Sequence, residues 1–123
     1  MTRINVGIFP EELCDKHLVA EYRELPRLWN FHPKSSPPDH FVLGKGHMLW
    51  CVQFPGMLYD RFVGLVNEMR FRGFTVNYPS PPEWARNGKR PNQLEIDKAR
   101  VIVMDRLRER ITQMSNVRYT KRK

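Results

Sequence analysis

Basic side chains within residues 16–27 could form a binding surface, with Glu24 as a carboxylate beside them. Lys16, Arg23 and Arg27 are spaced seven and four residues apart, so in a helix they share one stripe. Glu24 lies beside this stripe, three residues before Arg27, and a carboxylate among positive charges is expected to stay ionised. The same residues are also typical of a solvated helix face, with a local Glu24–Arg27 pair worth about 0.2–0.5 kcal/mol. The spacing alone leaves both interpretations open.

A second basic set lies near the end of the chain, within residues 93–113. Arg106 and Arg110 are one helical turn apart, and two guanidinium groups at that spacing can bind neighbouring phosphates. Asp105 and Glu109 could instead make them ordinary surface charges. The complete set comprises Lys98, Arg100, Arg106, Arg108 and Arg110.

The N-terminus offers a possible nucleophile. Thr2 is small enough that Met1 would normally be removed, which exposes the α-amine of Thr2. An α-amine titrates at about 7.7–8.0, well below lysine at about 10.4. A useful fraction is therefore neutral at physiological pH, as a Schiff-base nucleophile must be. Most cytoplasmic proteins share this property, so it carries little weight by itself.

Three helices joined by long, proline-rich connections are expected to position these groups. The first begins near Pro10, because proline suits the first helical turn, and ends or kinks at Pro26. The second follows Pro55-Gly56 and stops at Gly73, and the third runs from about Gln93 to Gln113. The expected inner faces are Cys14, Leu18, Tyr22 and Leu25 in the first helix; Leu58, Phe62, Leu65, Val66 and Met69 in the second; and Ile96, Val103, Leu107 and Ile111 in the third.

The connecting segments are less regular. Residues 33–38 and 78–91 read as loops, the latter with four prolines. Residues 41–54 could be a short strand pair or irregular, since periodicity does not decide. Trp50 and Trp84 are expected to pack in the core. The tail, residues 117–123, carries four positive charges and is expected to be exposed.

Length and composition narrow the class of protein. A chain of 123 residues suits one domain, residues 1–123. Its net charge of +8 points to a polyanion, most often nucleic acid, with anionic membrane as the competing partner. No apolar run approaches the roughly 20 residues of a membrane span, and no secretory signal is visible at the start. The two cysteines and four histidines lack metal-site spacing, so no metal site is expected. Two scattered thiols without a signal peptide suggest a reducing cytoplasm.

Read as a string, the opening of the chain resembles the pyrimidine-dimer DNA glycosylases of the phage endonuclease V type. The resemblance rests first on residues 2–5, Thr-Arg-Ile-Asn, and on residues 15–27, Asp-Lys-His-Leu-Val-Ala-Glu-Tyr-Arg-Glu-Leu-Pro-Arg. Residues 41–47, Phe-Val-Leu-Gly-Lys-Gly-His, look like the family's leucine-glycine-x-glycine-histidine segment. Residues 72–74, Arg-Gly-Phe, resemble the end of its second helix, and Arg106-Leu107 with Arg110-Ile111 resemble its last helix. The similarity covers about residues 2–113 and is densest in the first 27.

This resemblance implies a compact all-α domain of three helices that removes a damaged base and cleaves the abasic site by β-elimination. It implies the Thr2 α-amine as the nucleophile and Glu24 as the key carboxylate. The matching DNA-binding positions are Arg3, Lys16, His17, Arg23, Arg27, Arg106 and Arg110, with Arg110 standing where the phage enzyme has lysine. The expected partner is damaged double-stranded DNA, bound by a monomer in a bacterial or phage-infected cytoplasm, with no membrane, metal or organic cofactor.

The tail departs from the family pattern. The phage enzyme ends in an aromatic-rich segment, whereas residues 117–123 read Val-Arg-Tyr-Thr-Lys-Arg-Lys with a single aromatic. This departure affects the expected specificity for dimers more than the expected lyase chemistry. Two alternatives therefore accompany the glycosylase interpretation. One is an abasic lyase, or a glycosylase for another modified pyrimidine, and the other is a DNA-binding module without catalysis.

Overall fold

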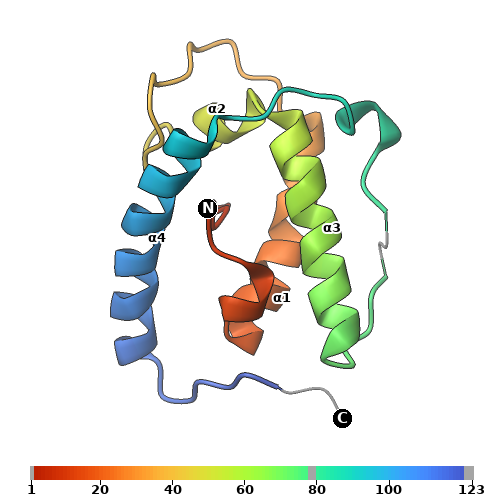
Figure 1. The fold of residues 1–123 in the computed structure, drawn as a ribbon, viewed down its shortest axis with the longest axis vertical. Helices are drawn as coiled ribbons and strands as arrows, with labels where there is room; N and C mark the ends of the chain where they lie inside the picture. The colour runs from red at the N-terminus through yellow and green to blue at the C-terminus, as the bar shows by residue number, and fades with distance from the viewer. Residues whose placement is uncertain (1, 78–79, 121–123) are drawn as a thin grey trace.

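The computed structural model describes residues 2–77 and 80–120, and over these residues the protein is all-α, as predicted. Three long helices, α1 (Asp15–Glu24), α3 (Pro55–Phe71) and α4 (Gln93–Gln113), form its frame. A short helix, α2 (His47–Val52), lies across one end (Figure 1). Three 3-10 helices complete the described secondary structure, at Pro10–Glu12, Leu25–Asn30 and Glu83–Ala85.

The second and third predicted helices are confirmed to within a residue or two at their ends. Pro55 occupies the first turn of α3, and Gly73 follows its end with φ +88°, a backbone conformation that favours glycine. At the start of α4, the Asn92 side chain accepts a hydrogen bond from the backbone N–H of Glu95 at 2.8 Å. Such a cap supplies a partner to an otherwise unpaired N–H group.

The first predicted helix and the 41–54 segment need correction. Pro10 begins a 3-10 helix that ends at Glu12, and the α-helix begins only at Asp15. Pro26 does end α1, since the chain continues from Leu25 as a 3-10 helix. Residues 41–54 contain α2 rather than a strand pair. This helix has six residues and no side-chain cap, which leaves too short a pattern to detect.

The N-terminal segment lies in the middle of the molecule, between α4 and the pair formed by α1 and α3 (Figure 1). Ile4, Val6 and Ile8 are at most 2% exposed. Gly7 makes the close packing possible: its φ is +83°, and a Cβ there would lie 2.8 Å from both Arg100 Cβ and the Ile96 carbonyl oxygen. The segment therefore fills the space between helices that would otherwise pack directly.

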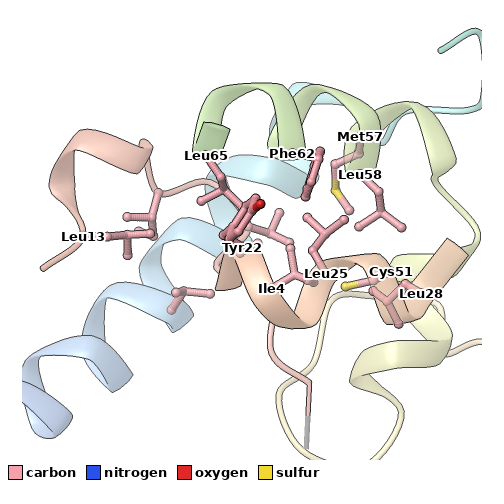
Figure 2. Close-up of a cluster of buried hydrophobic side chains, with 14 of the residues drawn as sticks. Ile4, Leu13, Tyr22, Leu25, Leu28, Cys51, Met57, Leu58, Phe62 and Leu65 are labelled. Carbon is pink, nitrogen blue, oxygen red and sulfur yellow. The ribbon is translucent and has the colours of Figure 1, made fainter. Parts of the chain in front are cut away.

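The core joins this segment to α1, α2, α3 and α4 (Figure 2). The Tyr22 and Phe62 rings stack with centroids 5.6 Å apart. Trp50 is buried as predicted, at 1% exposure, but the prediction for Trp84 is wrong, because this ring is 60% exposed and contacts Trp29 edge-on. The remaining labelled core residues are Ile4, Leu13, Leu25, Leu28, Cys51, Met57, Leu58 and Leu65.

Candidate DNA-binding and active site

A cavity of about 310 Å³ opens between the N-terminal segment, α1 and α4. One face of α1 supplies half of its lining, because positions 17, 20, 21 and 24 recur at helical spacing. Leu107 and Arg110 of α4 form the opposite wall. The complete lining is Arg3, Asn5, His17, Ala20, Glu21, Glu24, Leu107 and Arg110.

Two arginines that line the cavity, and a third beside it, carry positive charge with little carboxylate pairing. The pKa of Arg3 is lowered by burial first, and then by the charges of Arg110 and Arg106, so the three guanidinium groups lie close enough to repel one another. Within residues 2–77 and 80–120, neither Arg3 nor Arg110 has a carboxylate at ion-pair distance. Arg106 is only loosely paired, with its Nε 3.7 Å from Glu109 Oε2. Because like charges this close are unfavourable, this arrangement suits an anionic ligand.

Glu24 is the carboxylate available to that ligand. It is half-buried in the cavity wall, and it makes no ion pair or hydrogen bond with any described side chain. The local Glu24–Arg27 pair is thus not formed. A carboxylate that lines a cationic cavity without a partner of its own can interact with a bound molecule.

A second carboxylate in the wall, Glu21, has a structural role that the sequence analysis missed. Its side chain is 1% exposed and accepts hydrogen bonds from Arg61 Nε at 2.6 Å and from Arg61 Nη2 at 3.0 Å. Asn5 Nδ2 donates to Glu21 Oε1 at 2.7 Å, and Arg61 Nη1 donates to the Ile8 carbonyl. Glu21 thereby ties the N-terminal segment to α1 and α3. Its place between Leu18 and Leu25 on the buried stripe was the available signal.

His47, the first residue of α2, also contacts the N-terminal segment. The backbone N–H of Ile4 donates to His47 Nε2 at 2.9 Å, which makes Nε2 an acceptor. Its Nδ1–H therefore donates to the Val42 carbonyl, also at 2.9 Å. Burial lowers the pKa of His47, which keeps the ring neutral. The residue lies in the quoted 41–47 segment, but its spacing gave no indication of this contact.

The structure brings together only part of the predicted set. Arg3, His17, Glu24 and Arg110 line the cavity, and Arg106 lies beside it. Burial lowers the pKa of His17, and the charges of Arg110, Lys16 and Arg3 act in the same direction, so its ring is neutral at pH 7. The exposed side chains of Lys16, Arg23 and Arg27 lie outside the cavity lining, as does Thr2, which is 3% exposed.

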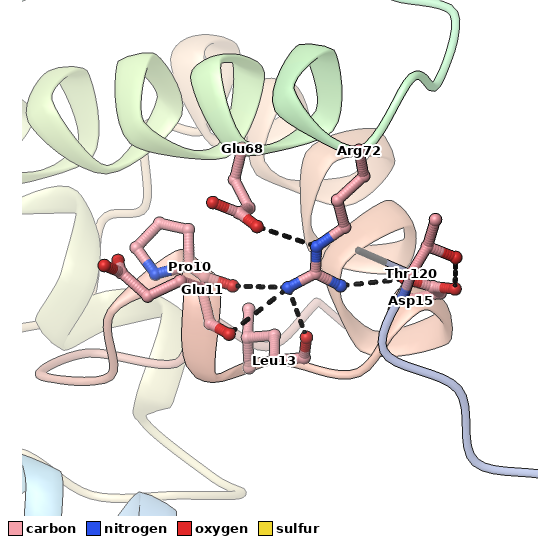
Figure 3. Close-up of polar contacts among 7 residues, drawn as sticks. All are labelled: Pro10, Glu11, Leu13, Asp15, Glu68, Arg72 and Thr120. Atoms are coloured by element: carbon pink, nitrogen blue, oxygen red, sulfur yellow. Dashed lines mark hydrogen bonds and ion pairs between the residues drawn. The ribbon is translucent and has the colours of Figure 1, made fainter. Parts of the chain in front are cut away.

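The tail continues from the end of α4 (Figure 1) and reaches the start of α1, where Thr120 lies beside Asp15 (Figure 3). The N–H of Asp15 donates to the Arg118 carbonyl at 2.7 Å, and the N–H of Thr120 donates to Asp15 Oδ1 at 2.9 Å. Arg118, Tyr119 and Thr120 are exposed, as expected for the tail, whereas residues 121–123 lie outside the described part of the chain.

Arg72 anchors the same corner, with a side chain that is 2% exposed. It donates to Asp15, to Glu68 and to three backbone carbonyls, those of Pro10, Glu11 and Leu13 (Figure 3). This guanidinium therefore serves the fold rather than the cavity.

Comparison with known families identifies the class of protein. The sequence model of the pyrimidine dimer DNA glycosylase family matches residues 1–81. The chain belongs to this family, whose members are DNA glycosylases of DNA repair. The match includes the N-terminal segment, α1 and α3, whereas α4, with Arg106 and Arg110, lies beyond it.

Two other classes of site find no support among the described residues. No helix of this part of the chain is long and apolar enough to cross a membrane. Nor do the described histidines, cysteines and acidic residues gather in groups of three that could hold a metal ion.

Proposed function

We propose that this glycosylase also cleaves the DNA strand at the abasic site, through a Schiff base on its own N-terminus. In this scheme Met1 is removed, and the neutral α-amine of Thr2 attacks C1′ of the damaged nucleotide. The bond between C1′ and the base breaks, and the base leaves with a proton. The nitrogen lone pair then forms the C1′=N bond of an imine as the C1′–O4′ bond breaks, and the proton lost by nitrogen reaches O4′.

The imine prepares the second cleavage. It acidifies the C2′ proton, and loss of this proton expels the 3′ phosphate by β-elimination. Glu24 is the group assigned to stabilise the cationic state at C1′ and to assist these proton transfers. The single observation that carries the proposal is this half-buried carboxylate, which is free of described partners and lies in one cavity with Arg3 and Arg110.

The cationic residues receive a separate role, which is to hold the DNA backbone. We assign phosphate binding to Arg3, Arg106 and Arg110, and the mutual repulsion of these neighbouring charges supports this role. Lys16 extends this set along α1, the neutral His17 would contribute a hydrogen bond to the DNA, and the exposed Arg23 and Arg27 would contact the strand outside the cavity. The target nucleotide must leave the duplex to reach the cavity, and damage lowers the cost of that step. The enzyme is proposed to act as a cytoplasmic monomer.

Borohydride reduction in the presence of abasic duplex DNA tests the nucleophile. We expect a covalent adduct that mass mapping places on the Thr2 α-amine, and loss of strand scission when extra residues block the N-terminus. An adduct on Lys16 or Lys45 would overturn this assignment. Failure to form any adduct, with DNA binding intact, would favour a DNA-binding module without catalysis.

Substitution of Glu24 tests the carboxylate. Glu24→Gln keeps the shape and loses the charge, so we expect the single-turnover scission rate to fall by about 10²–10⁴-fold, while the affinity for DNA stays or rises. Glu83→Gln is the matched control, because Glu83 is an exposed carboxylate of the 3-10 helix at Glu83–Ala85. Wild-type rates in Glu24→Gln would contradict the proposed role.

A preference for abasic sites over dimers is the second candidate function, and the tail favours it. Aromatic rings can stack on exposed bases, but within Val117–Thr120 only Tyr119 offers one, at 45% exposure. Basic side chains bind phosphates without distinguishing a dimer from normal bases. We therefore expect weaker discrimination for dimers than in a homologue with an aromatic tail.

A further inference from the structure

We propose that His47 is a positioning residue, whose neutral imidazole holds the N-terminal segment and thereby sets where the Thr2 amine lies. This inference rests on the proposed function, because it assumes a nucleophile at residue 2. The backbone N–H of Ile4 donates a hydrogen bond to His47 Nε2 at 2.9 Å. Ile4 lies two residues from the amine, so this contact is close enough to govern where the chain end lies.

The tautomer of His47 follows from its two partners. A backbone N–H can only donate, so Nε2 must carry a lone pair, and a carbonyl can only accept, so Nδ1 must carry the proton. His47 is 1% exposed, and Phe41 packs against it edge-on with centroids 5.4 Å apart. The ring therefore has little freedom to turn, and Gly46, with φ +90°, brings it into place at the first position of α2.

The charged and titratable groups around the ring come from three elements. Arg3 of the N-terminal segment and Glu21 of α1 act on it electrostatically in opposite senses, and Cys51 of α2 lies with its Sγ 3.9 Å from Nε2. Burial lowers the pKa of His47, as the charge of Arg3 also does, while the Val42 carbonyl and Glu21 raise it. Protonation would place an N–H at Nε2 against the Ile4 N–H, and the hydrogen bond would be lost.

The consequence is a dependence of the reaction on the state of His47, although this ring touches neither substrate nor reacting atoms. At pH values above the pKa of His47, the ring is neutral and holds the segment at Ile4, two residues from the amine. At pH values below the pKa of His47, the hydrogen bond to Ile4 is lost and the amine is displaced, in addition to being protonated itself. A displacement of about 1 Å in such a group can cost about 10²-fold in rate.

Two conservative substitutions separate positioning from packing. In His47→Gln the amide oxygen can reach the place of Nε2 and accept from Ile4, whereas in His47→Asn the shorter side chain reaches only the place of Nδ1. We expect His47→Gln to form the borohydride adduct within about 3-fold of the wild-type rate at pH 8, and His47→Asn to be slower by about 10–100-fold. Affinity for a duplex with a tetrahydrofuran abasic analogue, which cannot react, should change less than about 3-fold in both.

Nuclear magnetic resonance can detect the hydrogen bond between Ile4 and His47 directly. The wild type should show a scalar coupling through the hydrogen bond between the Ile4 amide nitrogen and His47 Nε2. This coupling should vanish on acidification, together with protection of the Ile4 amide from exchange. His47→Gln should keep the Ile4 amide protected at acid pH, because its amide does not titrate.

The outcomes are decisive in each case. Equal adduct rates in the Gln and Asn variants would overturn the positioning role. Absence of the coupling in the wild type would also overturn it, and this test holds even if one variant fails to fold. An adduct on a residue other than Thr2 in the wild type would overturn the proposed function instead. The contrast in Ile4 amide protection needs no chemistry, so it would still decide whether His47 holds the segment.

Discussion

The buried pair of Arg61 and Glu21 should lose more stability when one partner is substituted than when both are. Their side chains are 9% and 1% exposed, and the pair makes two nitrogen–oxygen contacts, at 2.6 and 3.0 Å. Arg61→Met removes one charge and leaves the Glu21 carboxylate buried with Asn5 as its remaining partner. Breaking such a pair from one side costs about 3–5 kcal/mol, chiefly because a charge stays buried without compensation.

The double variant Arg61→Met/Glu21→Gln removes that uncompensated charge. The amide oxygen introduced by Glu21→Gln can still accept the hydrogen bond from Asn5, so the main remaining loss is the donor to the Ile8 carbonyl, worth about 1–3 kcal/mol. The double variant should therefore be more stable than Arg61→Met alone, although it carries one more substitution. A thermodynamic cycle that includes Glu21→Gln isolates the coupling between the two sites.

Urea denaturation followed by circular dichroism measures the effect. With an m value of about 2 kcal/mol per M, Arg61→Met should lower the midpoint by about 1.5–2.5 M. Arg90→Met is the matched control, because Arg90 makes a similar two-contact pair with Asp60 at the surface, with side chains 43% and 59% exposed. An exposed pair contributes at most about 1 kcal/mol. The reasoning fails if Arg61→Met costs no more than this control, or if the double variant is the less stable.

Three further predictions concern binding, pH and specificity. Arg110→Gln should reduce the slope of log affinity for DNA against log salt concentration by roughly one unit. Arg108→Gln should leave this slope unchanged, because Arg108 pairs loosely with Asp105 on another face of α4. Equal slopes in the two variants would contradict a phosphate contact by Arg110. The free energy of unfolding should fall as the pH drops below about 6.5. Burial lowers the folded-state pKa of His17 and of His47, so the unfolded chain takes up protons at a higher pH than the folded chain does. Chemical denaturation between pH 7 and 5 should show this decline, and a flat profile would refute it. The ratio of kcat/KM for dimer-containing duplex to that for abasic duplex should be low, and Tyr119→Ala should remove what dimer preference remains; a high ratio that survives this substitution would place lesion recognition elsewhere.

The tail experiment uses a point substitution because of a contact that only the structure reveals. Deletion of residues 117–123 would also remove the hydrogen bonds of Arg118 and Thr120 to Asp15. Burial raises the pKa of Asp15, but the hydrogen bonds from Thr120 and Arg72 outweigh this effect and leave it lowered. Truncation would therefore disturb the start of α1, which carries His17, and would confuse lesion specificity with helix placement.

Local patterns in the sequence were sufficient for the longest helices. α3 and α4 span 17 and 21 residues, so their apolar side chains recur at helical spacing over several turns. Proline, glycine and asparagine also mark their ends, which made both helices predictable. The helix α2 could not be predicted, since six residues give fewer than two turns and begin after a glycine with no side-chain cap. Trp84 was assigned to the core on its residue type alone, and that guide fails for a ring on a surface loop.

The candidate site divides along the same line. The family resemblance and the helical spacing led to Arg3, His17, Glu24 and Arg110, which line one cavity. They did not lead to the groups that hold the cavity in shape, because those contacts join distant positions. Ile4 and His47 are 43 residues apart in sequence, and Glu21 and Arg61 are 40 apart. A period of three or four residues carries no information about such pairs.

The position of the N-terminal segment explains why both distant contacts converge on it. The first residues of a chain are ordinarily poorly ordered unless the fold ties them down. Here Ile4, Val6 and Ile8 bury their side chains, and His47 and Glu21 hold Ile4 and Asn5 by polar contacts from opposite elements. A reaction that uses the chain end as its nucleophile needs the end fixed to within a fraction of an ångström. Apolar contacts are not directional, whereas the hydrogen bonds from the Ile4 backbone N–H and from the Asn5 side chain are, and together they restrict how the segment can shift.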